Sequence, residues 1–175
     1  MPSKKSKPTA IPSSRSKAGR TSFNEAELSV WISKWAEELG ERHRRGQSLP
    51  RIALIGPMGA GKSTTARNLL DALAISREAE GSPTFAIAHE YRTANGLRVL
   101  HADGYRLGSE AELEATGLLE PLWQSEVLCL FEWMDSFPSV RAALSRSEFP
   151  YWEIEFGFDP DGDPGRREIR LSRRD

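Results

Sequence analysis

The chain has 175 residues, of which 38% are hydrophobic, and its formal net charge is −1. This length and composition suit one hydrophobic core and exclude two. No apolar run approaches the roughly 18 residues of a membrane-spanning helix, and no apolar stretch follows the basic N-terminus as it would in a secretory signal. A single cysteine, Cys129, excludes an internal disulfide and suits a reducing compartment. We therefore expect a cytoplasmic protein without a membrane partner.

The charge is unevenly distributed along the chain. Residues 1–22 hold six of the 24 Lys and Arg residues and no acid, which leaves 18 basic residues against 25 acidic ones in the remainder. The start of the chain is also rich in Ser and Pro, a composition too polar to form a core. We predict a disordered basic tail over residues 1–21 and a single domain over residues 22–175. The tail is a simple leader or an electrostatic arm for an acidic partner such as RNA.

The first predicted element is an amphipathic helix that follows the tail. Apolar residues recur at helical spacing in "FNEAELSVWISKWAEELGERHRR". Ser22 or Asn24 could cap this helix, because each has a Glu three positions later. "RIALIG" over residues 51–56 then predicts a buried strand, and after a glycine-rich turn "KSTTARNLLDALAI" over residues 62–75 predicts a second helix.

The second half of the chain is richer in strand patterns. "TFAIAHEY" and "LRVLHAD" read as a hairpin joined at "TANG", and "EVLCLFEW" as a second buried strand. Between them, "SEAELEATG" predicts a short helix capped by Ser109. "YWEIEFGF" and "REIRLS" predict a closing hairpin. The order predicts an α/β fold, a three-layer sandwich like that of P-loop NTPases, with a mostly parallel central sheet and antiparallel margins.

The strongest motif is "GPMGAGKS", Gly56 to Ser63, which fits the phosphate-binding pattern G-x-x-x-x-G-K-[ST]. It follows a predicted strand and opens a predicted helix, so its backbone N–H groups and the helix N-terminus favour a phosphate. Lys62 is expected to reach the β- and γ-phosphates of ATP, and the Ser63 hydroxyl to bind Mg²⁺. The expected nucleotide-binding residues of the loop and first helical turn are Met58, Gly59, Ala60, Gly61, Lys62, Ser63 and Thr64.

Two acids stand where such a loop needs a carboxylate partner. Asp103 ends the apolar run "LRVLHAD" and Glu132 ends "VLCLFE". Acids beyond the carboxyl ends of parallel strands lie near the phosphate loop, where they hold Mg²⁺ or orient the attacking group. We therefore expect both to serve catalysis and the metal. His101, two residues before Asp103, is a base, a phosphate contact or an orienting hydrogen-bond partner.

Further stretches place these motifs in a known family. "SPTF" over 82–85, "HADGYRL" over 101–107 and "FEW" over 131–133 follow the phosphate loop in sequence. With "GPMGAGKST" they resemble the TsaE family (formerly YjeE), bacterial ATPases of tRNA threonylcarbamoyladenosine biosynthesis, over roughly residues 22–172. The resemblance implies Mg²⁺-dependent ATP hydrolysis that supports N6-threonylcarbamoyladenosine modification of tRNA. It also implies partners of the TsaD and TsaB type. The basic tail lies outside the resemblance, and from its charge we expect at most weak or indirect tRNA contact.

The resemblance also implies roles for individual residues. Thr84 corresponds to a switch-like threonine that senses the γ-phosphate or its metal. Asp103 and Glu132 correspond to the acids needed for activity and for Mg²⁺. Trp133 sits beside the nucleotide, and Arg166, in "PGRREIRL", approaches the phosphates.

The chain departs from the family pattern at several positions. Pro57 and Met58 replace Asp-Leu in the loop, and Ser63 replaces a threonine but keeps its hydroxyl. Ala102 and Gly104 stand where the family prefers Phe and Leu. We expect this loss of bulk to loosen packing under the site or to alter a docking surface.

Two other functions remain open on the sequence. The loop could open a small-molecule kinase of the shikimate or nucleoside type, which needs an acceptor pocket and an arginine-bearing lid. Only Arg141 and Arg146 lie near a suitable position for that lid. The chain could also be an adaptor whose ATP occupancy controls assembly while hydrolysis is incidental.

Overall fold

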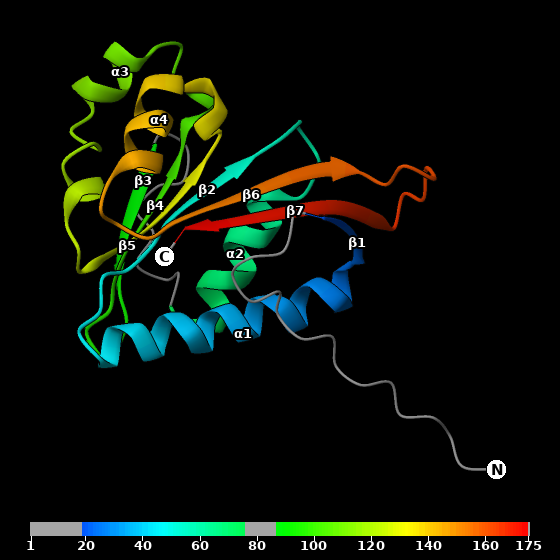
Figure 1. Ribbon diagram of the computed structural model, residues 1–175, viewed down its shortest axis with the longest axis horizontal. Coiled ribbons are helices and arrows are strands. Elements are labelled where there is room, and N and C mark those ends of the chain that lie inside the picture. The colour runs from blue at the N-terminus through cyan, green and yellow to red at the C-terminus, as the bar shows by residue number, and fades with distance from the viewer. Residues whose placement is uncertain (1–18, 76–86, 175) are drawn as a thin grey trace.

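A seven-stranded mixed sheet with helices on both faces forms the centre of the fold (Figure 1). The computed structural model describes residues 19–75 and 87–174. The strands are β1 (Arg20–Asn24), β2 (Arg51–Ile55), β3 (Ala88–Arg92), β4 (Arg98–Asp103), β5 (Val127–Glu132), β6 (Tyr151–Phe158) and β7 (Arg166–Arg174), and the α-helices are α1 (Glu25–Arg44), α2 (Lys62–Ala72), α3 (Glu110–Ala115) and α4 (Pro138–Arg146).

The sheet is parallel at its centre and antiparallel at both margins. Its strand order is β1-β7-β6-β2-β5-β4-β3. Strand β2 pairs in parallel with β5 and β6, and β5 pairs in parallel with β4. The β3–β4, β6–β7 and β1–β7 pairs are antiparallel. The predicted α/β class and sheet type are confirmed. Because β4, β5 and β2 are parallel neighbours, their carboxyl ends lie at the same edge of the sheet.

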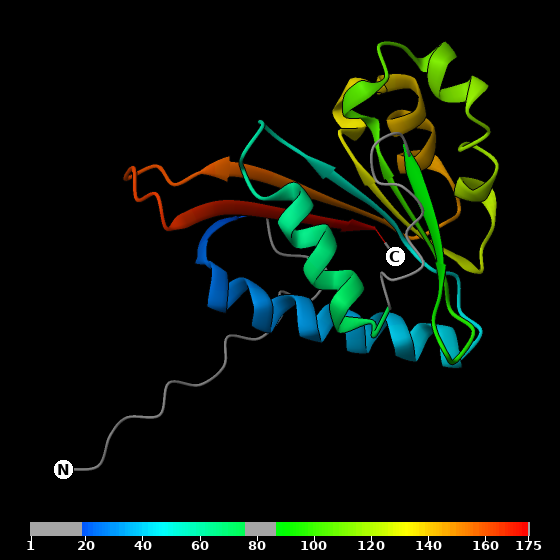
Figure 2. The ribbon, with the colours of Figure 1, turned by 180° about the vertical axis from the view of Figure 1, so that it is seen from behind.

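Helices α1 and α2 cover one face of the sheet, as Figure 2 shows from behind. The buried stripe of α1 includes Trp31, Trp35 and Leu39, which the helical spacing predicted. Asn24 caps this helix: its side chain accepts a hydrogen bond from the Glu27 N–H, and the Glu27 carboxylate accepts one from the Asn24 N–H. The structure thus selects Asn24 over Ser22 as the cap.

The opposite face carries α3, α4 and short 3₁₀ turns (Figure 1). Its core includes Ala53, Phe131, Phe137 and Leu144. Ser109 caps α3 through the Glu112 N–H, as predicted. Helix α4 was not predicted. It begins at a proline without a side-chain cap, so the usual start signal is missing.

Strand β1 lies at one edge of the sheet and was also not predicted. It begins at Arg20, so Arg20 and Thr21 belong to the sheet although the sequence placed them in the tail. The predicted strand over 84–91 is described only from residue 87 onward and forms β3. In the parts of the chain that the structure describes, no helix is long and apolar enough to cross a membrane.

Candidate functional site

The glycine-rich loop joins the end of β2 to the start of α2 and needs its glycines. Gly56 has φ +127°, and a Cβ there would lie 2.3 Å from the Phe156 carbonyl oxygen. Gly61 has φ +107° and is the N-cap of α2. Side chains other than hydrogen are strongly disfavoured in these conformations. The glycines of the motif are therefore required by the backbone conformation of the loop. This conformation places Gly56 against β6 and Gly61 at the N-terminus of α2.

Lys62, the first residue of α2, folds back over its own loop. Its Nζ donates hydrogen bonds to the carbonyl oxygens of Gly56 at 2.6 Å and Pro57 at 2.9 Å. The same ammonium group lies 3.6 Å from the centre of the Trp133 ring, a cation–π contact. Lys62 is 4% exposed. Two carbonyls and one aromatic face therefore hold the lysine at the mouth of the loop.

The surroundings of Lys62 are acidic. Burial removes water from its ammonium group and lowers the pKa of Lys62. Nearby carboxylates oppose that shift, in order of decreasing effect Asp135, Glu132 and Asp103. The lysine is thus the cation within an acidic group of side chains, next to the amides of the phosphate loop.

Glu132 links the phosphate loop to the strand ends. The Ser63 hydroxyl donates to Glu132 Oε2 at 2.6 Å, and His101 Nε2 lies 2.9 Å from Glu132 Oε1. Glu132 itself is 1% exposed. A carboxylate this deeply buried is costly unless its oxygens are satisfied, and here each has a partner. Of the roles open to His101, the structure favours the orienting hydrogen bond.

Asp103 lies directly opposite Glu132 in the parallel register of β4 and β5. Unlike Glu132 it is exposed, and its Oδ1 accepts a hydrogen bond from the Tyr105 N–H at 3.0 Å. Paired residues of neighbouring strands project to the same face, which here is the face of α2. The two predicted acids are therefore brought together beside Ser63.

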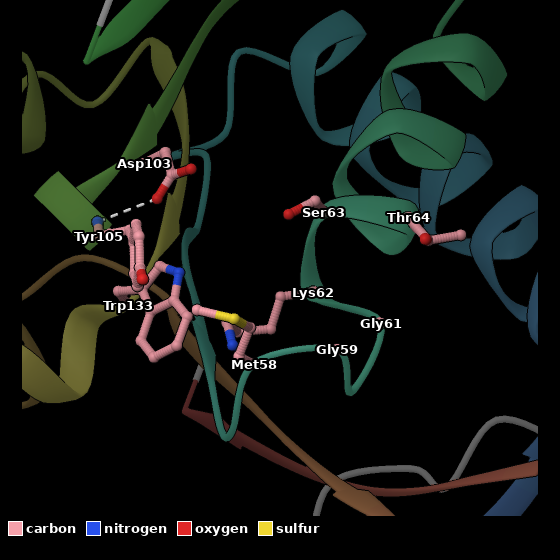
Figure 3. Close-up of a pocket in the computed structure, with 9 residues that line it drawn as sticks. All are labelled: Met58, Gly59, Gly61, Lys62, Ser63, Thr64, Asp103, Tyr105 and Trp133. Atoms are coloured by element: carbon pink, nitrogen blue, oxygen red, sulfur yellow. Dashed lines mark hydrogen bonds between the residues drawn. The ribbon is translucent and has the colours of Figure 1, made fainter. Parts of the chain in front are cut away.

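Figure 3 shows the pocket between these groups. Its volume is about 280 Å³, with the loop and the start of α2 on one side and Asp103, Tyr105 and Trp133 on the other. Tyr105 and Trp133 rings lie 5.1 Å apart, and Trp133 has φ +63°. Met58 and Tyr105 are 61% and 55% exposed, so an apolar rim borders a polar, acidic interior.

A second cleft adjoins the other side of the same loop. It has a volume of about 290 Å³ and shares Gly59, Gly61 and Thr64 with the first pocket. Ala60 of the same loop also lines it, and its further walls come from the β1–α1 junction and the β6–β7 hairpin: Phe23, Asn24, Glu25, Leu28, Phe156, Pro164, Gly165, Arg167 and Ile169. The sequence pointed only to its loop side, Gly59, Ala60, Gly61 and Thr64, because the other lining residues come from distant segments without a motif.

The remaining predicted site residues are placed differently. Arg166 does not line either pocket: its guanidinium binds the Ser22 hydroxyl and backbone oxygen at 2.9 Å each and the Glu27 carboxylate at 3.1 Å. It therefore fastens β7 to the β1–α1 junction, and this geometry does not support a phosphate contact. Ala60 is buried in the second cleft. Thr84 lies outside the described residues.

The departure at Gly104 leaves no loose packing, and the departure at Ala102 lies in the buried core. Ala102 is 0% exposed, and a Cβ on Gly104 would lie 2.5 Å from Phe137 Cε2 and 3.1 Å from Phe131 Cε1. The rings of Phe131 and Phe137 meet edge to face at 5.8 Å. The expectation of loosened packing is thus wrong, because Phe137 fills the space beside Gly104.

The donor set beside the loop fits a magnesium ion. Mg²⁺ prefers oxygen ligands and usually retains several waters while bound by one or two carboxylates and by phosphates. Ser63 and Glu132 supply hydroxyl and carboxylate oxygens 2.6 Å apart, with Asp103 on the adjacent strand end. Within residues 19–75 and 87–174, no group of three or more His, Cys, Asp or Glu side chains could hold a metal alone. This chemistry suits a metal shared with a nucleotide.

Comparison with known protein families identifies a match over most of the chain. A sequence model of the family described as "Threonylcarbamoyl adenosine biosynthesis protein TsaE" matches residues 28–162. The chain belongs to the TsaE family. That match includes the phosphate loop, Asp103 and Glu132, whereas Arg166 lies beyond it. TsaE is in general a family of ATP-binding P-loop ATPases, and membership implies involvement in threonylcarbamoyladenosine modification of tRNA.

Solved structures agree on the fold. The crystal structure of YdiB from Bacillus subtilis is similar to this TsaE-family chain, with a TM-score of 0.52 and 24% sequence identity. The likeness covers 90% of this chain and 87% of YdiB. No curated protein sequence matches the chain.

Proposed function

We propose that this chain is a cytoplasmic, Mg²⁺-dependent ATPase that supports threonylcarbamoyladenosine modification of tRNA together with transferase proteins of the TsaD and TsaB type. The observation that carries the proposal is the Ser63–Glu132 hydrogen bond. It joins the hydroxyl of the phosphate loop to a buried strand-end carboxylate, the pairing that a magnesium nucleotide needs. Membership of the TsaE family supports the tRNA process.

The residues of the pocket divide the work of hydrolysis. The loop amides receive the β-phosphate, and Lys62 exchanges the carbonyls of Gly56 and Pro57 for phosphate oxygens. Ser63 and Glu132 hold Mg²⁺, which when bound neutralises charge on the transferring phosphoryl group. Asp103, exposed at the pocket, or Glu132 orients the attacking water.

The second cleft is suited to the nucleoside. It begins where the first pocket ends, because both include Gly59, Gly61 and Thr64. Thr64 lies one residue beyond the phosphate-binding loop, so a chain of phosphates seated on the loop leads past it. The apolar walls Phe156 and Ile169 can contact a purine ring. The nucleotide would then span both pockets with the loop between them.

The exposed rim suits activation by a partner. Met58 and Tyr105 expose apolar side chains at the pocket mouth, where a docking protein can cover them and exclude water from the phosphates. Intrinsic turnover is then slow, and the partner completes or orders the site. The Pro57 and Met58 departures lie at this mouth.

The structure favours the ATPase over the kinase alternative. Arg141, one of the two candidate lid arginines, is bound by two hydrogen bonds of 2.7 Å to the Glu153 carboxylate. An arginine fixed in this way does not close over phosphates without breaking a bidentate ion pair. The adaptor alternative differs from our proposal only in whether hydrolysis is needed.

Turnover by three variants tests the enzymatic part of the proposal. Lys62→Ala and Glu132→Ala should each abolish ATP hydrolysis by the folded protein, measured with and without the partner proteins. Lys34→Ala, on α1 and outside both pockets, is the matched control and should hydrolyse ATP at the native rate. Normal hydrolysis by both Lys62→Ala and Glu132→Ala would refute the mechanism.

Nucleoside mass spectrometry of tRNA tests the biological part. Cells depleted of this protein should lose threonylcarbamoyladenosine, and the native gene should restore it. A variant that binds ATP without hydrolysing it should fail to restore the modification. Restoration by that variant would favour the adaptor alternative instead.

A further inference from the structure

We infer that His101 is a positioning residue that sets the Glu132 carboxylate for Mg²⁺, rather than a ligand, a base or a phosphate contact. The inference rests on the proposed function. Neither His101, whose side chain is 16% exposed, nor Glu132 lines either pocket, but Glu132 contacts Ser63, which does, whereas His101 contacts Glu132. A side chain so placed acts on the nucleotide site through Glu132.

The sheet register brings the two residues together. In the β4–β5 pair, His101 lies opposite Leu130 and Asp103 lies opposite Glu132. His101 is thus the diagonal neighbour of Glu132 on the face of α2, a separation that long side chains bridge. The observed contact is 2.9 Å between His101 Nε2 and Glu132 Oε1. The contact joins two hydrogen-bonded parallel strands, β4 and β5, so the backbone on both sides of it is fixed by the sheet.

The chemistry of the contact defines the role of the imidazole. A carboxylate oxygen without a proton only accepts hydrogen bonds, so the inferred role requires the His101 tautomer that carries its hydrogen on Nε2 and donates it to Oε1. A nitrogen that donates to Glu132 cannot at the same time abstract a proton from water. The other oxygen, Oε2, accepts from the Ser63 hydroxyl at 2.6 Å. The carboxylate is therefore held from two opposite ends, by the strand and by the phosphate loop.

Of the two hydrogen bonds to Glu132, only the one from His101 can stay unchanged when a metal binds. To hold Mg²⁺, Ser63 would turn an oxygen lone pair toward the ion and give up its present hydrogen bond to Oε2, whereas the His101 contact lies on the other carboxylate oxygen. His101 satisfies Oε1, which is buried with the rest of Glu132, and would leave Oε2 available to hold the metal. Groups that orient a metal-binding carboxylate in this way commonly contribute about 10- to 100-fold to metal affinity.

Mg²⁺ dependence of ATP binding tests the inference on the full chain. Calorimetric titrations give the ATP Kd in EDTA and the Mg²⁺ concentration that gives half of the metal-dependent gain in affinity. His101→Leu removes the donor at similar size, and His101→Gln retains an amide N–H that can reach Oε1. His89→Leu is the matched control. His89 lies on β3 opposite His101 on β4, and its ring stacks on Tyr91.

We expect His101→Leu to raise the half-saturating Mg²⁺ concentration by about tenfold or more, with the ATP Kd in EDTA unchanged. His101→Gln should restore most of the loss, and His89→Leu should match the native chain. If His101→Leu does not fold, His101→Asn, whose amide falls short of Oε1, takes its place in the comparison.

An unchanged half-saturating Mg²⁺ concentration in His101→Leu overturns the inference. So does a loss of ATP affinity that is equal with and without Mg²⁺. The same experiment separates this inference from the proposed function. Native protein that binds no ATP contradicts the proposed function and the inference together. Native protein that responds to Mg²⁺ beside an equally responsive His101→Leu contradicts only the role of His101.

Discussion

Adding one methyl group at Gly104 should destabilise the protein, because a phenylalanine ring already occupies the space. A Cβ there would lie 2.5 Å from Phe137 Cε2, and two more ring atoms, Phe131 Cε1 and Phe137 Cζ, lie at 3.1 Å. Phe137 is 0% exposed and contacts Phe131 edge to face. The ring therefore cannot move aside into solvent, and Gly104→Ala forces the core beside Asp103 to shift.

The expected decrease in the free energy of unfolding of Gly104→Ala follows from two opposing effects. Overpacking a filled core costs about 1–3 kcal/mol, while replacing glycine restricts the unfolded chain and returns about 0.4–1 kcal/mol. The two ranges subtract to about 0–2.6 kcal/mol, and the 2.5 Å approach to the buried Phe137 ring excludes the lower end, so we expect a net destabilisation of about 1–2 kcal/mol. For a domain of this size, each kcal/mol corresponds to a decrease in Tm of about 2–4 °C. Gly104→Ala should therefore lower the Tm by several degrees.

A double-mutant cycle with Phe137→Leu identifies the cause. Phe137→Leu alone should also destabilise, because it opens a cavity beside Gly104. In the double variant the new methyl group occupies that cavity, so the two losses should fall short of additivity by about 1 kcal/mol or more. Urea denaturation of the four proteins measures each free energy of unfolding. Additive losses, or native stability in Gly104→Ala, would refute the claim that Phe137 fills this space.

Two substitutions and one reactivity measurement test other parts of the structure. Arg51→Met should cost about 3 kcal/mol or more in the free energy of unfolding, because the buried guanidinium donates to the Leu49, Leu122 and Gln124 carbonyls; a loss under about 1 kcal/mol in urea denaturation would contradict this. Asn24→Ala should cost about 1 kcal/mol by removing the capping box of α1, with unchanged stability as the opposing result. Burial raises the pKa of Cys129 to about 12, so its thiol stays protonated at pH 8 and should react with a disulfide reagent only in denaturant; rapid reaction of the native protein would show that it is accessible.

The sequence predicted those parts of the site whose geometry is local. The loop from Gly56 to Ser63 specifies its own turn, since its glycines adopt conformations that other residues avoid. Asp103 and Glu132 end neighbouring parallel strands, so strand periodicity sufficed to bring them together. The capping box of α1 likewise lies within four successive residues.

Features that depend on distant partners were missed or misjudged. Strand β1 has little strand character in "RTSFN" and exists because it pairs with β7. Arg166 bonds to residues 139 and 144 positions earlier, which no spacing rule reveals. The space beside Gly104 is filled by Phe137, from a different part of the chain. Long-range packing decides these cases, and a single sequence does not record it.

Calorimetric titration of ATP into the full chain, with and without Mg²⁺, tests the central claim most directly. The account predicts saturable binding of one ATP per chain that Mg²⁺ tightens and that Lys62→Ala weakens. No saturable binding of ATP under either condition, or binding that ignores both Mg²⁺ and Lys62→Ala, would contradict it.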